Sequence, residues 1–143
     1  MSNANTRLVQ DAYAAFGRGE IPAVLEMMTA DVRMGIVGRS EDAPFLGIHE
    51  GKAGASEFFR LLDAAHAISK FEPVRFLAAE EKVFVWGRYA WTMRISGVSD
   101  ETEWLHVLTI RDGKISAWIG HNDTAMLAAA YHATPAAKRA GRG

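Results

Sequence analysis

The 143-residue sequence contains no cysteine, which excludes disulfide bonds, thiol nucleophiles and every Cys-containing zinc or iron–sulfur site. It also lacks an excess of either charge: 16 basic and 17 acidic residues leave no basic stripe of the kind that neutralises nucleic-acid phosphates. No apolar run approaches the roughly 20 residues that span a bilayer, and the N-terminal MSNANTRLVQ does not resemble a signal peptide. We therefore expect a cytoplasmic protein without nucleic-acid or membrane partners.

Apolar residues, by contrast, make up 49% of the chain, enough for a sizeable core without covalent crosslinks. This content and the length predict a single domain over residues 1–133. The remaining segment, 134–143, is rich in small and charged residues and is expected to be a disordered tail.

The first half of the chain predicts three helices. Apolar residues at helical spacing mark residues 4–16, after which Gly17 and Gly19 end the helix. Pro22 suits the first turn of a short second helix, and a repeat at i, i+3, i+4 and i+7 marks a third over residues 51–67. Between them, a short strand is expected at 31–37, and part of the apolar connection 38–52 is expected to cover the core as a lid.

The second half predicts an antiparallel sheet, because stretches rich in β-branched and aromatic residues alternate with short polar turns. The expected strands are residues 71–79, 82–96, 102–111 and 114–122. Gly87 interrupts the longest of them and is expected at a bulge or bend that curls the sheet. A last short helix, capped by Asn122 or Asp123, is expected to end near His132.

His106 stands out because it lies in the middle of an otherwise apolar strand face. Trp104 and Leu108 share that face by the period-two alternation of a strand, so the imidazole points into an apolar environment. Such a histidine can be a hydrogen-bonded core residue or, since imidazole ordinarily titrates near neutral pH, a catalytic acid and base. The sequence therefore predicts a pocket around His106 without naming its ligand.

An order of helices followed by a curled antiparallel sheet is an α+β arrangement. Within it, the segments YAAFGRGEIPAVLEMMTADV, GIHEGKAGASEFF and WLHVLTIRDGKISAWIGHND resemble the nuclear transport factor 2-like superfamily, in its ketosteroid isomerase-related and polyketide-cyclase (SnoaL-like) branch. The resemblance covers residues 5–133. It implies a cone-shaped α+β barrel, with three N-terminal helices packed on a curled antiparallel sheet that encloses a hydrophobic pocket.

The resemblance also suggests roles for single residues. It places the hydrogen-bond-donating acid of the steroid isomerases at His106 and the phenol of their oxyanion hole beside Tyr13. The general-base aspartate of those enzymes falls near Ile36, which cannot accept a proton, and the acidic residue that some cyclases and epoxide hydrolases carry falls on Gly120. His106 is therefore the principal catalytic candidate, with Tyr13 or Asn122 polarising a ligand oxygen.

The residues alone leave two registers open for the last hairpin. If Asp112 and Gly113 form a two-residue turn, residue 111 pairs with 114, and His121 shares the face of His106. In a three-residue loop with Gly113 as a bulge, residue 110 pairs with 114 and His106 lies opposite Trp118. His121 then points away, while Gly120 and Asn122 join the face of His106. The resemblance implies this second arrangement.

Apolar side chains are expected to line the pocket, although the tryptophans among them can equally be packing residues. The candidates for ligand contact are Phe16, Met34, Ile36, Phe45, Phe58, Leu62, Trp86, Trp104, Leu108 and Trp118. A second apolar sheet face is formed by Leu105, Val107, Ile115 and Ile119. Because that face needs a cover which one layer of helices cannot supply, we expect a homodimer packed sheet to sheet, as the resemblance also implies.

Two functions from different classes follow. One is a cofactor-independent enzyme of isomerase, dehydratase or cyclase type, in which His106 moves a proton on a small hydrophobic ring or polyketide-like carbonyl compound. The alternative is a protein of the same fold that binds such a ligand without converting it. A third possibility, an adaptor domain, predicts a cavity plugged by aromatic side chains. The other histidines lack the spacing of a metal site, so neither a metal nor an organic cofactor is expected.

Overall fold

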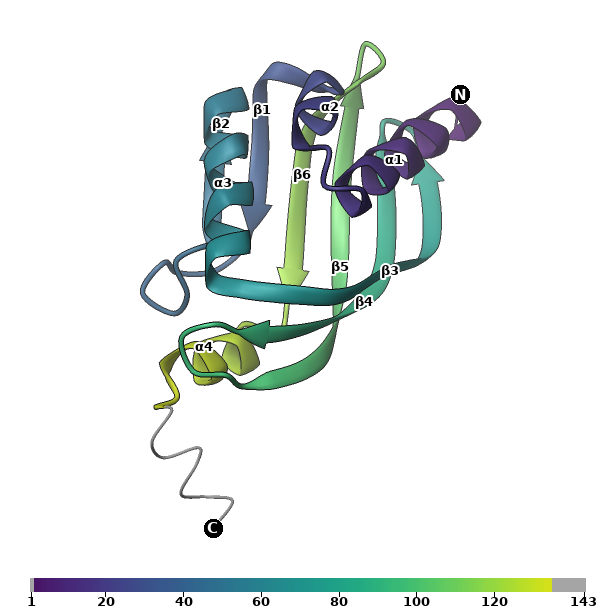
Figure 1. Ribbon diagram of the computed structural model, residues 1–143. Coiled ribbons are helices and arrows are strands. Elements are labelled where there is room, and N and C mark those ends of the chain that lie inside the picture. Colours follow the sequence, from purple (N-terminus) through teal and green to yellow (C-terminus); the bar gives the residue numbers. More distant parts are fainter. Residues whose placement is uncertain (1, 135–143) are drawn as a thin grey trace.

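A computed structural model describes residues 2–134 of the chain, in which helices cover one face of a sheet (Figure 1). The predicted tail lies almost wholly outside the described residues. The elements are α1 (Ser2–Gly17), α2 (Ile21–Glu26), β1 (Met28–Ile36), β2 (Gly47–Glu50), α3 (Gly51–Ala65), β3 (His66–Ala79), β4 (Lys82–Met93), β5 (Ser99–Arg111), β6 (Lys114–Asn122) and α4 (Thr124–His132). The predicted helices are all present, and Asp123 caps α4 by accepting a hydrogen bond from Met126 N.

The six strands form one sheet in the order β2-β1-β6-β5-β4-β3. Strands β3 to β6 form the predicted antiparallel meander, but β1 runs parallel to β6, so the sheet is mixed. The sheet is also open, with β2 and β3 as its edges, and does not close into the expected cone-shaped barrel. The predicted α+β class, with N-terminal helices packed on a sheet, is confirmed.

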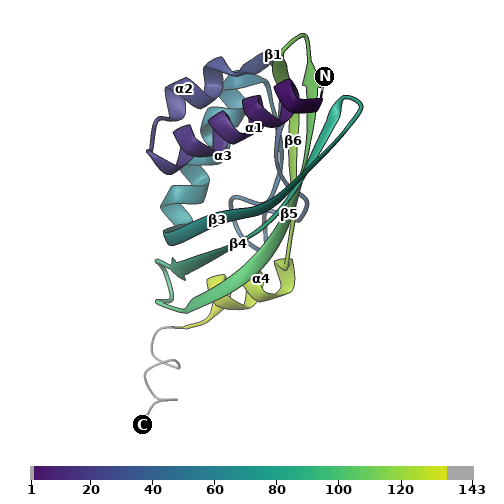
Figure 2. The same cartoon turned by 90° about the vertical axis from the view of Figure 1, so that its right-hand side faces the viewer.

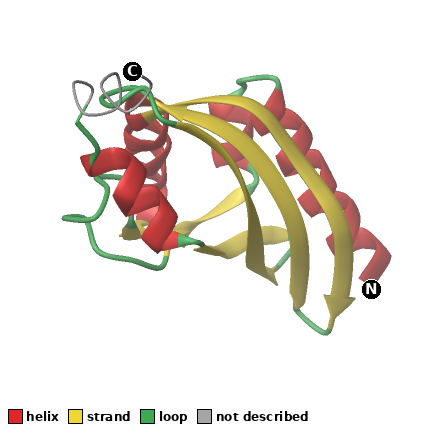
Figure 3. Cartoon of the chain, turned by 90° about the horizontal axis from the view of Figure 1, so that it is seen from below, coloured by secondary structure: helices red, strands yellow, loops and turns green. Residues whose placement is uncertain are grey.

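Helices α1, α2 and α3 form a single layer on one sheet face, and α4 lies apart at the end of the sheet (Figure 2). In α1, the buried side chains Val9, Ala12 and Tyr13 recur at helical spacing, and α3 buries Phe58 and Leu62 in the same way. The long strands bend along their length (Figure 3), and β3 carries two bulges. No helix among the described residues is long and apolar enough to cross a membrane.

Gly87 lies opposite one of these bulges rather than in one. It pairs with Pro73, and the irregularity falls between Pro73 and Arg75 on the neighbouring strand. A Cβ on Gly87 would collide with the indole of Trp104 and with the backbone oxygen of Glu72. The glycine is therefore required by the close approach of Trp104, which crosses the strand at this position.

The hairpin of β5 and β6 combines features of both predicted registers. Its turn has two residues, Asp112 and Gly113, both with positive φ, and Arg111 pairs with Lys114. A bulge beyond Thr109 then shifts the pairing, so that His106 faces Gly120 and not Trp118. The bulge gives His106 the expected face, shared with Gly120 and Asn122, and leaves His121 exposed.

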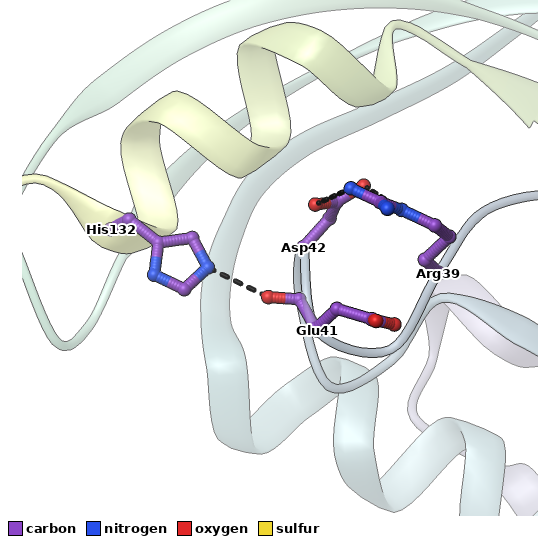
Figure 4. A network of polar contacts seen from close by, with 4 residues as sticks. All are labelled: Arg39, Glu41, Asp42 and His132. Atoms are coloured by element: carbon purple, nitrogen blue, oxygen red, sulfur yellow. Dashed lines mark hydrogen bonds and ion pairs between the residues drawn. The ribbon is translucent and has the colours of Figure 1, made fainter.

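The connection between β1 and β2 is a lid in part, as expected, although it covers a different region of the core. Phe45 is fully buried there and its ring stacks on His66 at 4.7 Å between centroids, which removes it from the surroundings of His106. Helix α4 holds this connection from outside: Nε2 of His132 donates to the backbone oxygen of Glu41 at 2.8 Å (Figure 4). Nearby, Arg39 pairs with Asp42 within the same loop.

Candidate active site

A small internal chamber lies between the helix layer and the sheet, at the position of His106. Its volume is about 40 Å³, comparable to one or two water molecules. We call it the inner chamber. Its lining residues are Phe16, Met34, Gly35, Ile36, Phe58, Phe59, Leu62, Ile68, Phe71, Tyr89, Trp104, His106, Trp118, Gly120 and Asn122.

A larger outer groove opens next to this chamber. Its volume of about 720 Å³ is in the range of small-molecule sites, and it is bounded by the α1–α2 turn, α3 and the start of β3. The groove and the inner chamber share five lining residues: Phe16, Phe59, Leu62, Ile68 and Phe71. Three of these are in ring contact, with Phe16 5.7 Å from Phe59 and 5.1 Å from Phe71. A ligand body can therefore occupy the groove while a small head group enters the chamber.

Hydrogen bonds fix the tautomer of His106. Trp118 Nε1 lies 3.0 Å from His106 Nδ1, and the hydroxyl of Tyr13 lies 2.6 Å from the same nitrogen. Because an indole N–H can only donate, Nδ1 must be unprotonated and accept. The proton of a neutral imidazole is then on Nε2, because both hydrogen bonds that the described residues make to this ring end on Nδ1. His106 thus offers the chamber an N–H donor.

The electrostatic surroundings keep this imidazole neutral. Burial lowers the pKa of His106 to about 3, and the neighbouring His121 lowers it further. The indole of Trp104 stacks on the ring with 3.9 Å between centroids, which excludes water from that face. An unperturbed histidine would exchange protons near neutral pH, but His106 instead serves there as a neutral hydrogen-bond donor.

Tyr13 supports His106 from behind. It is 5% exposed and is not among the residues that line the inner chamber. Burial raises the pKa of its hydroxyl well above 10, an effect that Trp118 partly offsets, so the phenol keeps its proton and donates to Nδ1. The structure therefore places Tyr13 as a positioning residue that contacts His106.

Asn122 and Gly120 form the floor of the chamber next to His106. A Cβ on Gly120 would lie 3.2 Å from Cδ2 of His106 and 3.4 Å from Oδ1 of Asn122, so both side chains border the space above the glycine. Oδ1 of Asn122 is buried and has no hydrogen-bond partner. Nε1 of Trp104 is likewise buried and unpaired. Leaving such groups unpaired costs about 1–3 kcal/mol each, so both are poised to bind a polar group.

Seven of the predicted contact residues line the inner chamber: Phe16, Met34, Ile36, Phe58, Leu62, Trp104 and Trp118. Three do not. Phe45 belongs to the region around His66, and Leu108 is fully buried in the core on the same sheet face as His106. Trp86 lies on the opposite sheet face, because Val85 pairs with His106 and side chains alternate along the strand.

Four further side chains line the chamber although they were not expected from the sequence: Phe59, Ile68, Phe71 and Tyr89. Phe59 follows a predicted contact residue on the same helix, and Tyr89 shares its strand face with Gly87, so the spacing contained a signal for both. Phe71 contacts Tyr13 and Trp104 from β3, the edge strand. Its position depends on the bulge between Ile68 and Lys70, which the sequence does not reveal.

The chamber is almost free of ionisable groups. Its described lining contains no Asp, Glu, Lys or Arg side chain. Among the described residues, no cluster of three His, Cys, Asp or Glu side chains could hold a metal ion. The charged side chains Arg60, Asp63 and Lys70 lie instead along the outer groove.

Comparison with solved structures identifies the NTF2-like fold. An NTF2-like protein from Burkholderia xenovorans LB400 is 28% identical, with a TM-score of 0.83 over 92% of this chain and 98% of that one. An NTF2-like protein of unknown function from Burkholderia pseudomallei is 26% identical, with a TM-score of 0.82 over 93% and 100%. TerC, co-crystallised with polyporic acid, is 22% identical, with a TM-score of 0.78 over 91% and 99%.

Within that fold, the chain belongs to the SnoaL-like domain family, whose pattern matches residues 9–118. Structural neighbours of the chain also include candidate polyketide cyclases and candidate isomerases. No curated protein sequence matches it significantly.

Proposed function

We propose that this protein is a cofactor-independent enzyme that polarises the carbonyl oxygen of a small hydrophobic compound with the Nε2–H of His106. The observation that carries this proposal is the pair of donors, Tyr13 and Trp118, on Nδ1 of the same ring. They leave a single N–H aimed away from both donors, in an apolar chamber where a hydrogen bond to an oxyanion is stronger than in water.

The charge that His106 stabilises develops when a carbonyl becomes an enolate. The C–H bond next to the carbonyl breaks, its proton leaves to water or another base from the solvent, and the negative charge moves to the oxygen that His106 holds. A proton returned to a different carbon gives an isomer, whereas attack of the enolate carbon on a second carbonyl closes a ring. Both outcomes are redox-neutral, which fits the isomerase and cyclase activities proposed for structural neighbours.

The lining of the chamber also constrains the substrate. No carboxylate is present there to remove the proton, and His106 itself is too weak a base at a pKa of about 3. A suitable substrate therefore has a C–H bond that is already acidified, as between two carbonyls or between a carbonyl and an aromatic ring. Polyketide-like and aromatic-ring ketones meet this requirement, and the outer groove, with phenylalanine rings as well as charged side chains in its lining, has room for their bodies.

Hydrogen–deuterium exchange on 2-tetralone tests the proposal, because the ring and carbonyl of this bicyclic ketone both activate one carbon. In D₂O, the protein should accelerate exchange at that carbon, as followed by NMR. His106→Ala should lower the protein-dependent rate by about 10²–10³-fold, the usual effect of removing one oxyanion donor. It should also cost about 1–3 kcal/mol of stability. An unfolded variant, or one with an undiminished rate, would contradict the assignment of His106.

The second candidate function is binding without conversion. The absence of Asp and Glu side chains from the described chamber lining favours it, since a binding protein needs no base. TerC, a protein of the same fold, was crystallised with polyporic acid, which supports a small organic ligand for the site in either case. Saturable binding of 2-tetralone without accelerated exchange would support the binding protein and contradict the enzyme.

We further propose that two copies of the chain associate through the outer sheet face. Leu105, Val107 and Ile119 lie on that face, away from the helices, and Leu105 is 42% exposed. Phe84 and Trp86 of the neighbouring strand extend the same apolar surface. Ile115, which was expected to join them, is fully buried on the core side because the bulge in the hairpin reverses its orientation. Burial of this surface against a second copy would remove it from water.

A further inference from the structure

The inner chamber contains a hydrogen-bond acceptor as well as the donor described above. Oδ1 of Asn122 is buried without a partner, and it lies beside the imidazole of His106 over Gly120. A ligand that offers only a carbonyl oxygen would satisfy His106 and leave this amide oxygen unpaired. Whether the oxygen, rather than the amide nitrogen, faces the chamber therefore decides which head group fits.

A chain of contacts behind Asn122 settles its orientation, starting from a backbone carbonyl. Nδ1 of His66 lies 2.9 Å from the backbone oxygen of Leu62, which can only accept, so Nδ1 carries the proton. His66 is fully buried and burial lowers its pKa, so the ring is neutral and Nε2 must accept. The hydroxyl of Tyr89, 3.2 Å away, is the donor.

This chain reaches the chamber through Tyr89, which lines it. Since the Tyr89 hydroxyl gives its only proton to His66, its oxygen can only accept from other neighbours. Tyr89 and Asn122 both line the chamber, where an accepting hydroxyl suits the NH₂ group of Asn122 and not its amide oxygen. Oδ1 of Asn122 is buried without a partner and is the atom left for the ligand.

We propose that the site selects a head group with an adjacent acceptor and donor: a carbonyl that accepts from His106 Nε2 and an O–H or N–H that donates to Asn122 Oδ1. Cyclic enols, hydroxy ketones and lactams have this pair. The inference deepens the proposed function and rests on it, because the carbonyl half is the group that His106 polarises. His66 and Tyr89 are positioning residues: they hold the amide of Asn122 and touch no substrate atom that reacts.

Selectivity follows from the cost of an unpaired buried oxygen. A ligand with both groups satisfies His106 and Asn122, whereas a ligand of equal size without the donor displaces solvent and leaves Oδ1 unpaired. A site built to bind a donor discriminates well against analogues that lack it. We therefore expect two ligands of the same shape to differ in affinity when only one of them carries the donor, even if they are equally hydrophobic.

The test compares 2-quinolone with coumarin, two bicyclic compounds of nearly the same shape in which an N–H is replaced by a ring oxygen. Titrations followed by the indole N–H signals of Trp104 and Trp118 report binding at the chamber itself. Wild-type protein should bind 2-quinolone about five- to tenfold more tightly than coumarin, the range expected for one net hydrogen bond. Equal affinities, or tighter binding of coumarin, would overturn the inference but leave the carbonyl site standing. Failure of both compounds to bind would overturn the proposed function as well.

Variants assign the preference to particular atoms. Asn122→Leu removes the acceptor and should bring the affinity ratio close to one, while His106→Phe should weaken both ligands and keep the ratio. Tyr89→Phe releases the amide of Asn122 and should reduce the ratio without changing the affinity for coumarin. Tyr131→Phe, on α4 and outside the chamber lining, is the matched control and should match wild type. An unchanged ratio in folded Asn122→Leu protein would overturn the assignment of the acceptor.

Discussion

His106 has two ring nitrogens with different tasks. Nδ1 accepts from Tyr13 and Trp118, and Nε2 is left to donate into the chamber. If the ring became protonated, Nδ1 would gain a proton directed at the Trp118 N–H, which can only donate and would lose its acceptor. The same contacts that fix the tautomer therefore oppose protonation, in addition to the effect of burial.

This arrangement predicts a stability that falls in acid. The pKa of His106 is about 3 in the folded protein, against 6.5 for an unperturbed histidine, so only the unfolded chain binds this proton between those values. The contribution of neutral His106 to the unfolding free energy is fully present above pH 6.5. It is lost as the pH falls toward 3, by up to about 1.4 kcal/mol per pH unit. His66, whose pKa is also lowered, acts in the same direction.

Urea unfolding at a series of pH values between 7 and 3 measures this slope. His106→Phe should make the dependence shallower, because one of the two depressed histidines is removed. An NMR titration in which the His106 imidazole protonates near the usual value for histidine would contradict the assignment.

The two donors on Nδ1 predict unequal effects of removing one or both. Tyr13→Phe deletes only the hydroxyl, and Trp118 still donates to Nδ1, so the Nε2–H tautomer should persist. The rate of 2-tetralone exchange should then fall by no more than about tenfold, the value of one hydrogen bond. Tyr13→Phe combined with Trp118→Phe frees Nδ1, and the two tautomers should become mixed in ¹⁵N NMR spectra. A tautomer change in the single variant would show that Trp118 alone does not hold the ring.

At the scale of the elements, the sequence predicted the correct face of β5 and β6 but not their pairing. The two-residue turn at Asp112 and Gly113 alone would have placed His121 beside His106. The bulge beyond Thr109 inserts one extra residue and so returns His121 to the opposite face. No residue type in this region indicates a bulge. Local turn chemistry was therefore readable in the sequence, while an irregularity determined by packing was not.

The same distinction applies to the site. His106, Trp104 and Trp118 could be predicted because period-two alternation places them on one face. The orientation of Asn122 could not, since it depends on packing in a chamber that is also lined by residues distant in sequence, such as Tyr89. Strand β2 was missed because its four residues are too few to show a pattern.

Gly87 allows a prediction about the sheet itself. Gly87→Ala would drive a methyl group into the indole of Trp104 and the backbone of β3, neither of which can move freely. We expect a loss of about 1–3 kcal/mol or more in unfolding free energy, together with displacement of the Trp104 ring that stacks on His106. Gly17→Ala is the control, since nothing lies within 4 Å of its added methyl. Equal stability of the two variants in chemical denaturation would contradict the close packing described here.

At the scale of the whole molecule, the sheet has two unlike faces. Helices α1, α2 and α3 cover one face (Figure 2), where the chamber lies, whereas Leu105 and its apolar neighbours lie on the other face. A sheet that is apolar on both sides needs cover on both sides. The fold thus separates the proposed catalytic surface from the proposed association surface by the thickness of a single sheet.

This separation leads to a prediction about association that is independent of the chemistry. A charge on the outer face should prevent two copies from packing, because the carboxylate would have to leave water without a partner. Val107→Glu, whose side chain lies between Phe84 and Ile119 on the neighbouring strands, should therefore sediment as a monomer at micromolar concentration, where the wild type should be a dimer. Ile95→Glu, at an exposed position beyond the end of β4, is the matched control and should remain dimeric. A wild-type protein that sediments only as a monomer would contradict the proposed association, and the apolar outer face would then need another partner.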